Sequence, residues 1–208
     1  MSTVVPLSDK IVTLGVTIDS NLALSNHSSN ICRSTHYHIR ALHHIRRSLT
    51  DDVAKTVAAS IDHSRIDYAN SLVHGSKNIK KLQRLQNTDA RIVLPHLSQL
   101  PTISLLRELH WLTVYSRITY KLSCLTYNAL NAGHLGYLRS LINYCRPIPS
   151  RTLWSTNQLL DCPPFSTEFG KRSFSYLALT VWNVLPLDIR LSPTTDTFKR
   201  RLKTHLFA

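Results

Sequence analysis

The spacing of apolar residues is the feature of this sequence that most constrains its fold. Over most of the 208 residues, apolar side chains recur at steps of three and four, which is the period of an amphipathic helix. Glycine, which often interrupts such elements, occurs only five times. The pattern therefore predicts a mainly α-helical protein.

One short region near the N-terminus departs from this period. Residues 11–18 alternate in polarity around Gly15 and are rich in β-branched side chains. This pattern is typical of a strand or a short hairpin. We therefore expect a single short β segment before the helices.

Three helical segments are expected next. The first begins near Asn30, and its predicted apolar side comprises Ile31, His38, Leu42, Ile45 and Leu49. The second begins after Thr50, whose hydroxyl can cap a helix, and its predicted apolar face comprises Val53, Val57, Ala58 and Ile61. The third lies between Gly75 and Pro95, and its predicted inward residues are Ile79, Leu82, Leu85 and Ile92. Three helices of this size can form a bundle.

The remainder of the chain predicts a second helical region. A short helix is expected over 102–109 and a longer one through Ala129, ended by a break over 131–136. Residues 146–164 contain four of the nine Pro and predict an extended crossover. A terminal helix from Thr195 should pack through Phe198, Leu202 and Leu206. The expected divisions are 1–24 for the β segment, 25–97 for the bundle and 98–208 for the second region.

The charge balance suggests the kind of partner. Lys and Arg total 25 against 12 Asp and Glu, and the usual partner of such a polycation is nucleic acid or an anionic membrane surface. We expect no membrane segment, because no apolar run is long enough to span a bilayer. The four Cys are far apart and form no C-x-x-C pair, which favours a reducing, intracellular setting, nuclear or cytoplasmic.

The first predicted helix carries the most distinctive charges. Five basic or His residues recur at steps of three and four on the side opposite its apolar residues: Arg33, His36, Arg40, His43 and Arg47. No acidic residue interrupts this series. Such a stripe can be a solvated helix face, but it can also neutralise phosphates along a duplex without reading its sequence. We interpret it as a nucleic-acid-binding face.

Other candidate sites are better explained as structure. Asp51 and Asp52 are the only adjacent acidic pair, but their position at a predicted helix start indicates dipole compensation. His36 and His43 lie two turns apart, which does not favour zinc. No nucleophile elbow and no phosphate loop is present. Trp111 and Trp182 are expected in the core, and the role of Trp154 in the crossover is left open. We predict no metal and no cofactor.

A series of short motifs runs in order along the chain. They are Leu14-Gly15-Val16-Thr17-Ile18-Asp19-Ser20, Ile31-Cys32-Arg33, Ser64-Arg65-Ile66-Asp67-Tyr68, Leu82-Gln83-Arg84-Leu85-Gln86-Asn87, Leu109-His110-Trp111-Leu112, Val181-Trp182-Asn183, Leu185-Pro186 and Leu202-Lys203-Thr204-His205-Leu206-Phe207. In order and approximate spacing, this series resembles the C-terminal part of non-LTR (LINE-type, jockey- or Rex-like) retrotransposon reverse transcriptases, from primer grip through thumb to tail. Leu14, Gly15 and Val16 resemble the primer grip, and Ile31-Cys32-Arg33 resembles the start of the thumb.

The resemblance implies a polymerase fragment that lacks its fingers and palm. In such enzymes palm aspartates hold two metal ions, Mg in the full-length family enzyme, and only thirteen residues precede Leu14 here. We therefore expect a truncated, non-catalytic chain whose thumb-like bundle binds a template–primer duplex, RNA or DNA. One alternative is part of an active reverse transcriptase whose palm is encoded upstream. Another is a helical protein without a selected function. The oligomeric state is left open.

Overall fold

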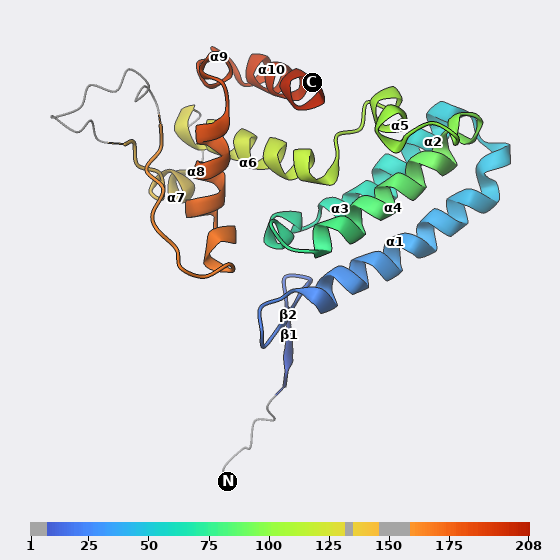
Figure 1. Cartoon of the computed structure of the whole chain (residues 1–208), viewed down its shortest axis with the longest axis horizontal. Helices are drawn as coiled ribbons and strands as arrows, with labels where there is room; N and C mark the ends of the chain where they lie inside the picture. Colours follow the sequence, from blue (N-terminus) through green and yellow to red (C-terminus); the bar gives the residue numbers. More distant parts are fainter. Residues whose placement is uncertain (1–7, 132–134, 146–158) are drawn as a thin grey trace, which may run out of the picture. The chain divides into compact units, whose positions relative to one another are not determined.

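The computed structural model describes residues 8–131, 135–145 and 159–208 (Figure 1). The chain forms two compact units, Met1–Val114 and Tyr115–Ala208. Both units are built almost entirely from helices, and the one sheet in the described residues is a short N-terminal pair of strands. The predicted mainly α-helical fold with a short N-terminal β segment is thus confirmed.

The β segment is a tight hairpin. Strand β1 (Lys10–Thr13) pairs antiparallel with β2 (Val16–Asp19), and Leu14 and Gly15 form the connection. Both turn residues have positive φ, 47° and 73°, as a two-residue hairpin turn that follows the strand twist requires. Glycine adopts this conformation without steric cost. The Tyr68 hydroxyl donates a hydrogen bond to the Leu14 carbonyl and so holds the strained residue in place.

Three helical rods follow the hairpin and pack against one another (Figure 1). The first is α1 (Ser25–Ile45), continued by the 3₁₀ turn η1 (Arg46–Ser48), and the third is α4 (Asn78–Val93). The middle rod is α2 (Asp51–Ala58), the π-helical η2 (Ala59–His63) and α3 (Ser64–Asp67). Two 3₁₀ turns, η3 (Asn70–Val73) and η4 (Pro95–Leu97), flank α4.

The buried side of α1 lies slightly around the helix from the predicted one. Thr35, Ile39 and Leu42 are buried, whereas His38 is half-buried and Ile45 is 51% exposed. The prediction of Ile45 as inward is therefore wrong. Because each residue advances about 100° around the axis, a face centred on Thr35 and Leu42 leaves Ile45 at its edge, where α1 ends.

The predicted inward face of the middle rod is wrong at two positions. Val53 and Ile61 are 47% and 38% exposed, while the small residues Ala54 and Ala58 are completely buried. Alanine lets the backbones of packed helices approach closely, so Ala54 and Ala58 face the neighbouring rods. A π-helix inserts an extra residue in the turn and so rotates the side chains that follow it. The rotation buries Asp62 in place of Ile61.

On α4, hydrophobic periodicity predicts the inward residues in part. The basic residues of α4 and of its N-cap are all exposed: Lys77, Lys80, Lys81, Arg84 and Arg91. Leu82 and Leu85 are buried, but Ile79 and Ile92 are only half-buried. Two polar residues, Gln86 and Asp89, lie fully inside. Gln86 is satisfied there because its Nε2 donates to the Leu112 carbonyl at 2.9 Å.

The first unit continues beyond the expected boundary after residue 97. Helix α5 (Thr102–Glu108) packs on α4, and Leu105, Leu106 and Trp111 share one core with Leu42 and Ala90. Trp111 is buried, as predicted. These contacts explain why the unit continues to Val114.

The second unit has its own apolar core. Its helices are α6 (Val114–Asn131), α7 (Gly136–Arg139), α8 (Phe174–Val184), α9 (Leu187–Arg190) and α10 (Thr195–Phe207), with the 3₁₀ turn η5 (Gly170–Arg172) before α8. Phe198 stacks on Tyr127 with ring centroids 4.3 Å apart. Phe198, Leu202 and Trp182 are buried as predicted, and Leu206 packs at the edge of this core.

Much of the expected crossover, with Trp154, lies outside the described residues. The chain on either side of it is paired: Tyr144 and Leu160 form an antiparallel bridge. The Cys145 amide donates to the Leu159 carbonyl at 3.0 Å, and the Asp161 amide donates to the Asn143 carbonyl at 2.8 Å.

Candidate nucleic-acid interface

The outward face of α1 gathers the predicted basic residues on one rigid element. Arg33, His36, Arg40 and His43 are all exposed and project from the same 21-residue helix. From Arg33 to Arg40 is two helical turns, about 10 Å at 1.5 Å per residue. The helix contains no acidic residue, so its cations have no partner within it. The face therefore presents two arginines and two His residues with no carboxylate on the same helix.

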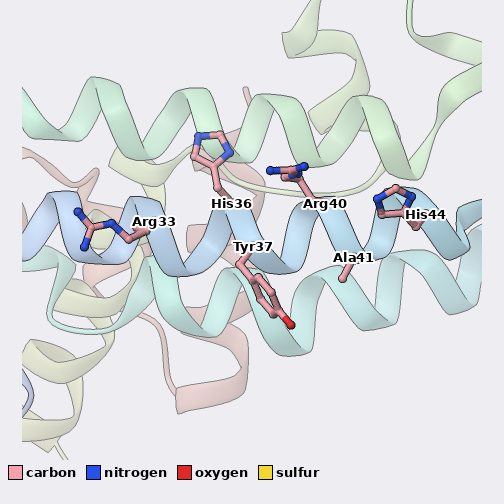
Figure 2. Close-up of a pocket in the computed structure, with 6 residues that line it drawn as sticks. All are labelled: Arg33, His36, Tyr37, Arg40, Ala41 and His44. Atoms are coloured by element: carbon pink, nitrogen blue, oxygen red, sulfur yellow. The ribbon is translucent and has the colours of Figure 1, made fainter.

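A shallow open pocket runs along this face (Figure 2). Arg33, His36 and Arg40 line it, together with three residues that the sequence analysis did not assign: Tyr37, Ala41 and His44. Tyr37 is 72% exposed, and its ring points to the side of the α1 axis opposite to His36 and Arg40 (Figure 2). The signal was present in the sequence, because Tyr37 and His44 follow Arg33 and Arg40 at steps of four and share their side of a helix. His43 is exposed but does not line the pocket.

Arg47 continues the row in a different local structure. It lies in the 3₁₀ turn η1, beyond the end of α1, and is exposed. Its neighbour Arg46 points the other way and is mostly buried. The Arg46 guanidinium donates to the carbonyls of Ile92, Val93 and Leu49 and pairs with Asp51. Arg46 therefore holds the end of α4, while Arg47 remains available to a ligand.

The primer-grip-like residues occupy the hairpin turn and β2. Leu14 is 88% exposed at the tip, Gly15 completes the turn, and Val16 is buried. Tyr68 lies against the turn, with its ring 3.4 Å from where a side chain on Gly15 would begin. The hairpin is thus attached to the segment that follows α3. This brings the two motifs beginning at Leu14 and Ser64 together in space.

The acidic residues show why sequence adjacency is a poor guide to paired carboxylates. Thr50 caps α2 by accepting a hydrogen bond from the Val53 amide, with Asp51 and Asp52 in the first turn, so their predicted capping position is confirmed. The carboxylates that interact inside the fold are Asp62 and Asp89, on different rods. Burial raises the pKa of Asp89 to about 8, with a further contribution from Asp62. Burial also raises the pKa of Asp62 to about 6, against the opposing charge of Arg65.

His63 and Trp111 complete this buried group. The His63 ring meets the Trp111 ring edge-on, with centroids 4.1 Å apart, and its Nε2 lies 3.7 Å from Asp89 Oδ2. That separation is too long for a hydrogen bond, and a protonated Asp89 carries no charge to pair. We name Asp62, His63, Asp89 and Trp111 the buried polar cluster. Its sequestration from solvent indicates a structural role.

Within the described ranges, no three His, Cys, Asp or Glu side chains gather closely enough to hold a metal ion. The helices described there also include none whose length and apolarity suit a membrane span. No protein-family model, curated protein or solved structure matches this chain. The functional assignment of the α1 face therefore depends on its geometry and charge.

Proposed function

We propose that this chain binds nucleic acid through the outward face of α1. One observation carries the proposal: Arg33, His36, Arg40 and His43 are exposed on one side of a helix without acidic residues. Arginines in such a row can neutralise successive phosphates of one backbone, because phosphate contacts need charge and spacing but no particular base. Tyr37 adds a ring on which an unpaired base can stack.

We further propose that the chain is a truncated, non-catalytic C-terminal fragment of a non-LTR retrotransposon RNA-directed DNA polymerase. The ordered series of motifs from Leu14 to Phe207 supports this origin. Two-metal catalysis needs paired carboxylates, and the two pairs described above have structural positions: Asp62 and Asp89 are buried, whereas Asp51 and Asp52 are exposed in the first turn of α2, after its Thr50 cap. The alternative is a piece of an active enzyme. An in-frame aspartate pair in the genomic DNA immediately upstream would favour that alternative.

The salt dependence of duplex binding tests the interface. The variant Arg33→Ala/Arg40→Ala/Arg47→Ala removes three cations from the face. On double-stranded DNA, each phosphate that a protein neutralises contributes about 0.9 to the slope of log affinity against log salt. If each arginine neutralises one phosphate, the triple variant should have a slope that is shallower by roughly three. The loss should be similar for duplexes of unrelated sequence, since backbone contacts carry little sequence information. Fluorescence anisotropy over a salt series measures both the affinity and its salt slope.

The matched control removes equal charge from α4. Lys81 is not a suitable choice, because its charge acts on Cys32 of α1. The control is therefore Lys77→Ala/Lys80→Ala/Arg84→Ala, which removes three exposed cations from α4 and its N-cap. It should change the slope much less. Equal flattening by both triple variants would mean general attraction by a basic protein and would refute a specific α1 interface.

A further inference from the structure

A second, smaller pocket lies in the first unit where the hairpin meets the helices. Its walls come from three parts of the chain: β2 and its turn, the first half of α1, and the segment from α3 to Tyr68. Its polar lining residues are Thr17, His27, Asn30, Ser34, Arg65 and Tyr68. The cavity measures about 280 Å³, near the lower end of the range for small-molecule sites. It therefore suits a group much smaller than a duplex.

Hydrogen bonds hold the pocket walls in place. Arg65 Nη1 donates to the Ser34 hydroxyl at 2.8 Å, which orients the guanidinium beside α1. On the hairpin side, Asn30 Nδ2 approaches the Thr17 hydroxyl at 3.5 Å. No carboxylate is among the residues lining this pocket. Its polar groups are one guanidinium and several neutral donors, which is the chemistry that receives an anion.

His27 supplies an independent indication of a ligand. Its side chain is only 3% exposed, and its Nε2 has no hydrogen-bond partner among the described residues. A buried polar nitrogen without a partner destabilises a fold, since its hydrogen bond to water is lost without replacement. Burial also lowers the pKa of His27, which favours a neutral ring that can donate one N–H. A ligand acceptor in the pocket would satisfy this nitrogen.

We propose that this pocket binds a single phosphate monoester, with Arg65 as the cation and His27 and Asn30 as neutral donors. A monoester carries close to two negative charges at neutral pH, against one for a backbone phosphodiester, so it gains more from one guanidinium. Two sources share this chemistry: a free mononucleotide, and the phosphorylated end of a nucleic-acid strand. Asn30 and Ser34 lie within one turn of Arg33, so the strand-end case extends the proposed function and depends on it.

Three duplexes and one free ligand distinguish these sources. The duplexes have identical sequence and carry a 5′-phosphate, a 3′-phosphate or only hydroxyl ends, and the free ligand is AMP. A strand-end site should bind one phosphorylated duplex about tenfold more tightly than the hydroxyl duplex. Arg65→Gln should abolish that preference and leave binding of the hydroxyl duplex unchanged. Arg84→Gln, which replaces an exposed arginine of α4, should retain it.

AMP titration followed by NMR of the His ring protons tests the pocket even if no duplex binds. A saturable shift of His27 that is lost in Arg65→Gln, without preference among duplexes, would assign the pocket to a free mononucleotide. His27→Phe keeps a ring at that position and should weaken AMP or strand-end binding without unfolding the protein, as circular dichroism would show. Equal affinity for all three duplexes together with an unshifted His27 would overturn the proposal. Failure of the α1 interface would instead appear as unchanged salt slopes.

Discussion

The outer face of α1 and the buried polar cluster both contain ionisable side chains, but in opposite environments. Arg33, Arg40 and their neighbouring His residues are exposed to solvent, whereas Asp62, His63 and Asp89 are almost completely buried. In water an ionised group costs the fold little and stays available to a ligand. In the interior, desolvation opposes ionisation and raises the pKa of both carboxyls. Substitutions should therefore change binding in the first region and stability in the second.

The largest effect is expected at Trp111. Trp111→Ala removes a buried ring that packs on His63 and on the core shared by α4 and α5. Truncations of this kind lower the free energy of unfolding by about 3–5 kcal/mol. Urea unfolding followed by circular dichroism measures the loss. The triple arginine variant of the α1 face should stay within about 1 kcal/mol of the parent chain, because it changes exposed residues. If Trp111→Ala and the triple arginine variant lost comparable free energies of unfolding, the two regions would not differ in their contribution to stability.

An intermediate effect is expected from two adjacent arginines. Arg46→Ala removes a mostly buried guanidinium bonded to the carbonyls of Ile92, Val93 and Leu49, and should cost about 1.5–3 kcal/mol. Arg47→Ala should cost less than about 0.5 kcal/mol but lower the salt slope of duplex binding by about one. Thermal melts and anisotropy on the same two proteins measure these effects. Arg47→Ala melting well below Arg46→Ala would contradict the assignment of the two roles.

The smallest effect, taken per pH unit, is a pH dependence arising from the buried polar cluster. Asp89 is protonated in the fold up to about pH 8, whereas an unfolded Asp ionises near pH 4. The contribution of the protonated Asp89 to stability is therefore complete below about pH 4. It is lost as the pH rises toward the pKa of Asp89 in the folded state. Between those limits the free energy of unfolding should fall by about 1.4 kcal/mol per pH unit. Urea midpoints at pH 5.5, 6.5 and 7.5 test the trend.

Asp89→Asn is the matched variant for that trend. The amide keeps the shape of a protonated carboxyl but cannot ionise, so the decline with pH should become markedly smaller. Asp62, whose pKa is raised to about 6, should leave a weaker dependence at lower pH. If the free energy of unfolding falls as steeply with pH in Asp89→Asn as in the parent chain, the pH dependence does not arise from Asp89. Asp52→Asn, at the exposed start of α2, is a control that should leave the slope unchanged.

The sequence alone predicted the elements that depend on local rules. The helical period led to α1, α4 and α10, the threonine before Asp51 led to a capped helix, and alternation around Gly15 led to the hairpin. Phe198 and Leu202 were placed in the core because a spacing of four puts both on one side of a helix. The exposed basic residues of α1 were found for the same reason. The period of a helix by itself determines which of its side chains lie on the same face, independently of the elements that pack against it.

Tertiary structure decided the features that involve several elements. The π-helix η2 rotated Asp62 inward and Ile61 outward, and no sequence period signals such a shift. The pairing of Asp62 with Asp89, and the pocket that joins Thr17, His27 and Arg65, bring together residues far apart in the chain. Arg46 and Arg47 are chemically identical neighbours, yet only packing against α4 separated their roles. Local periodicity determines the direction in which each side chain points from its own helix. Whether that side chain is buried, and which residue it pairs with, depends on where the other helices lie.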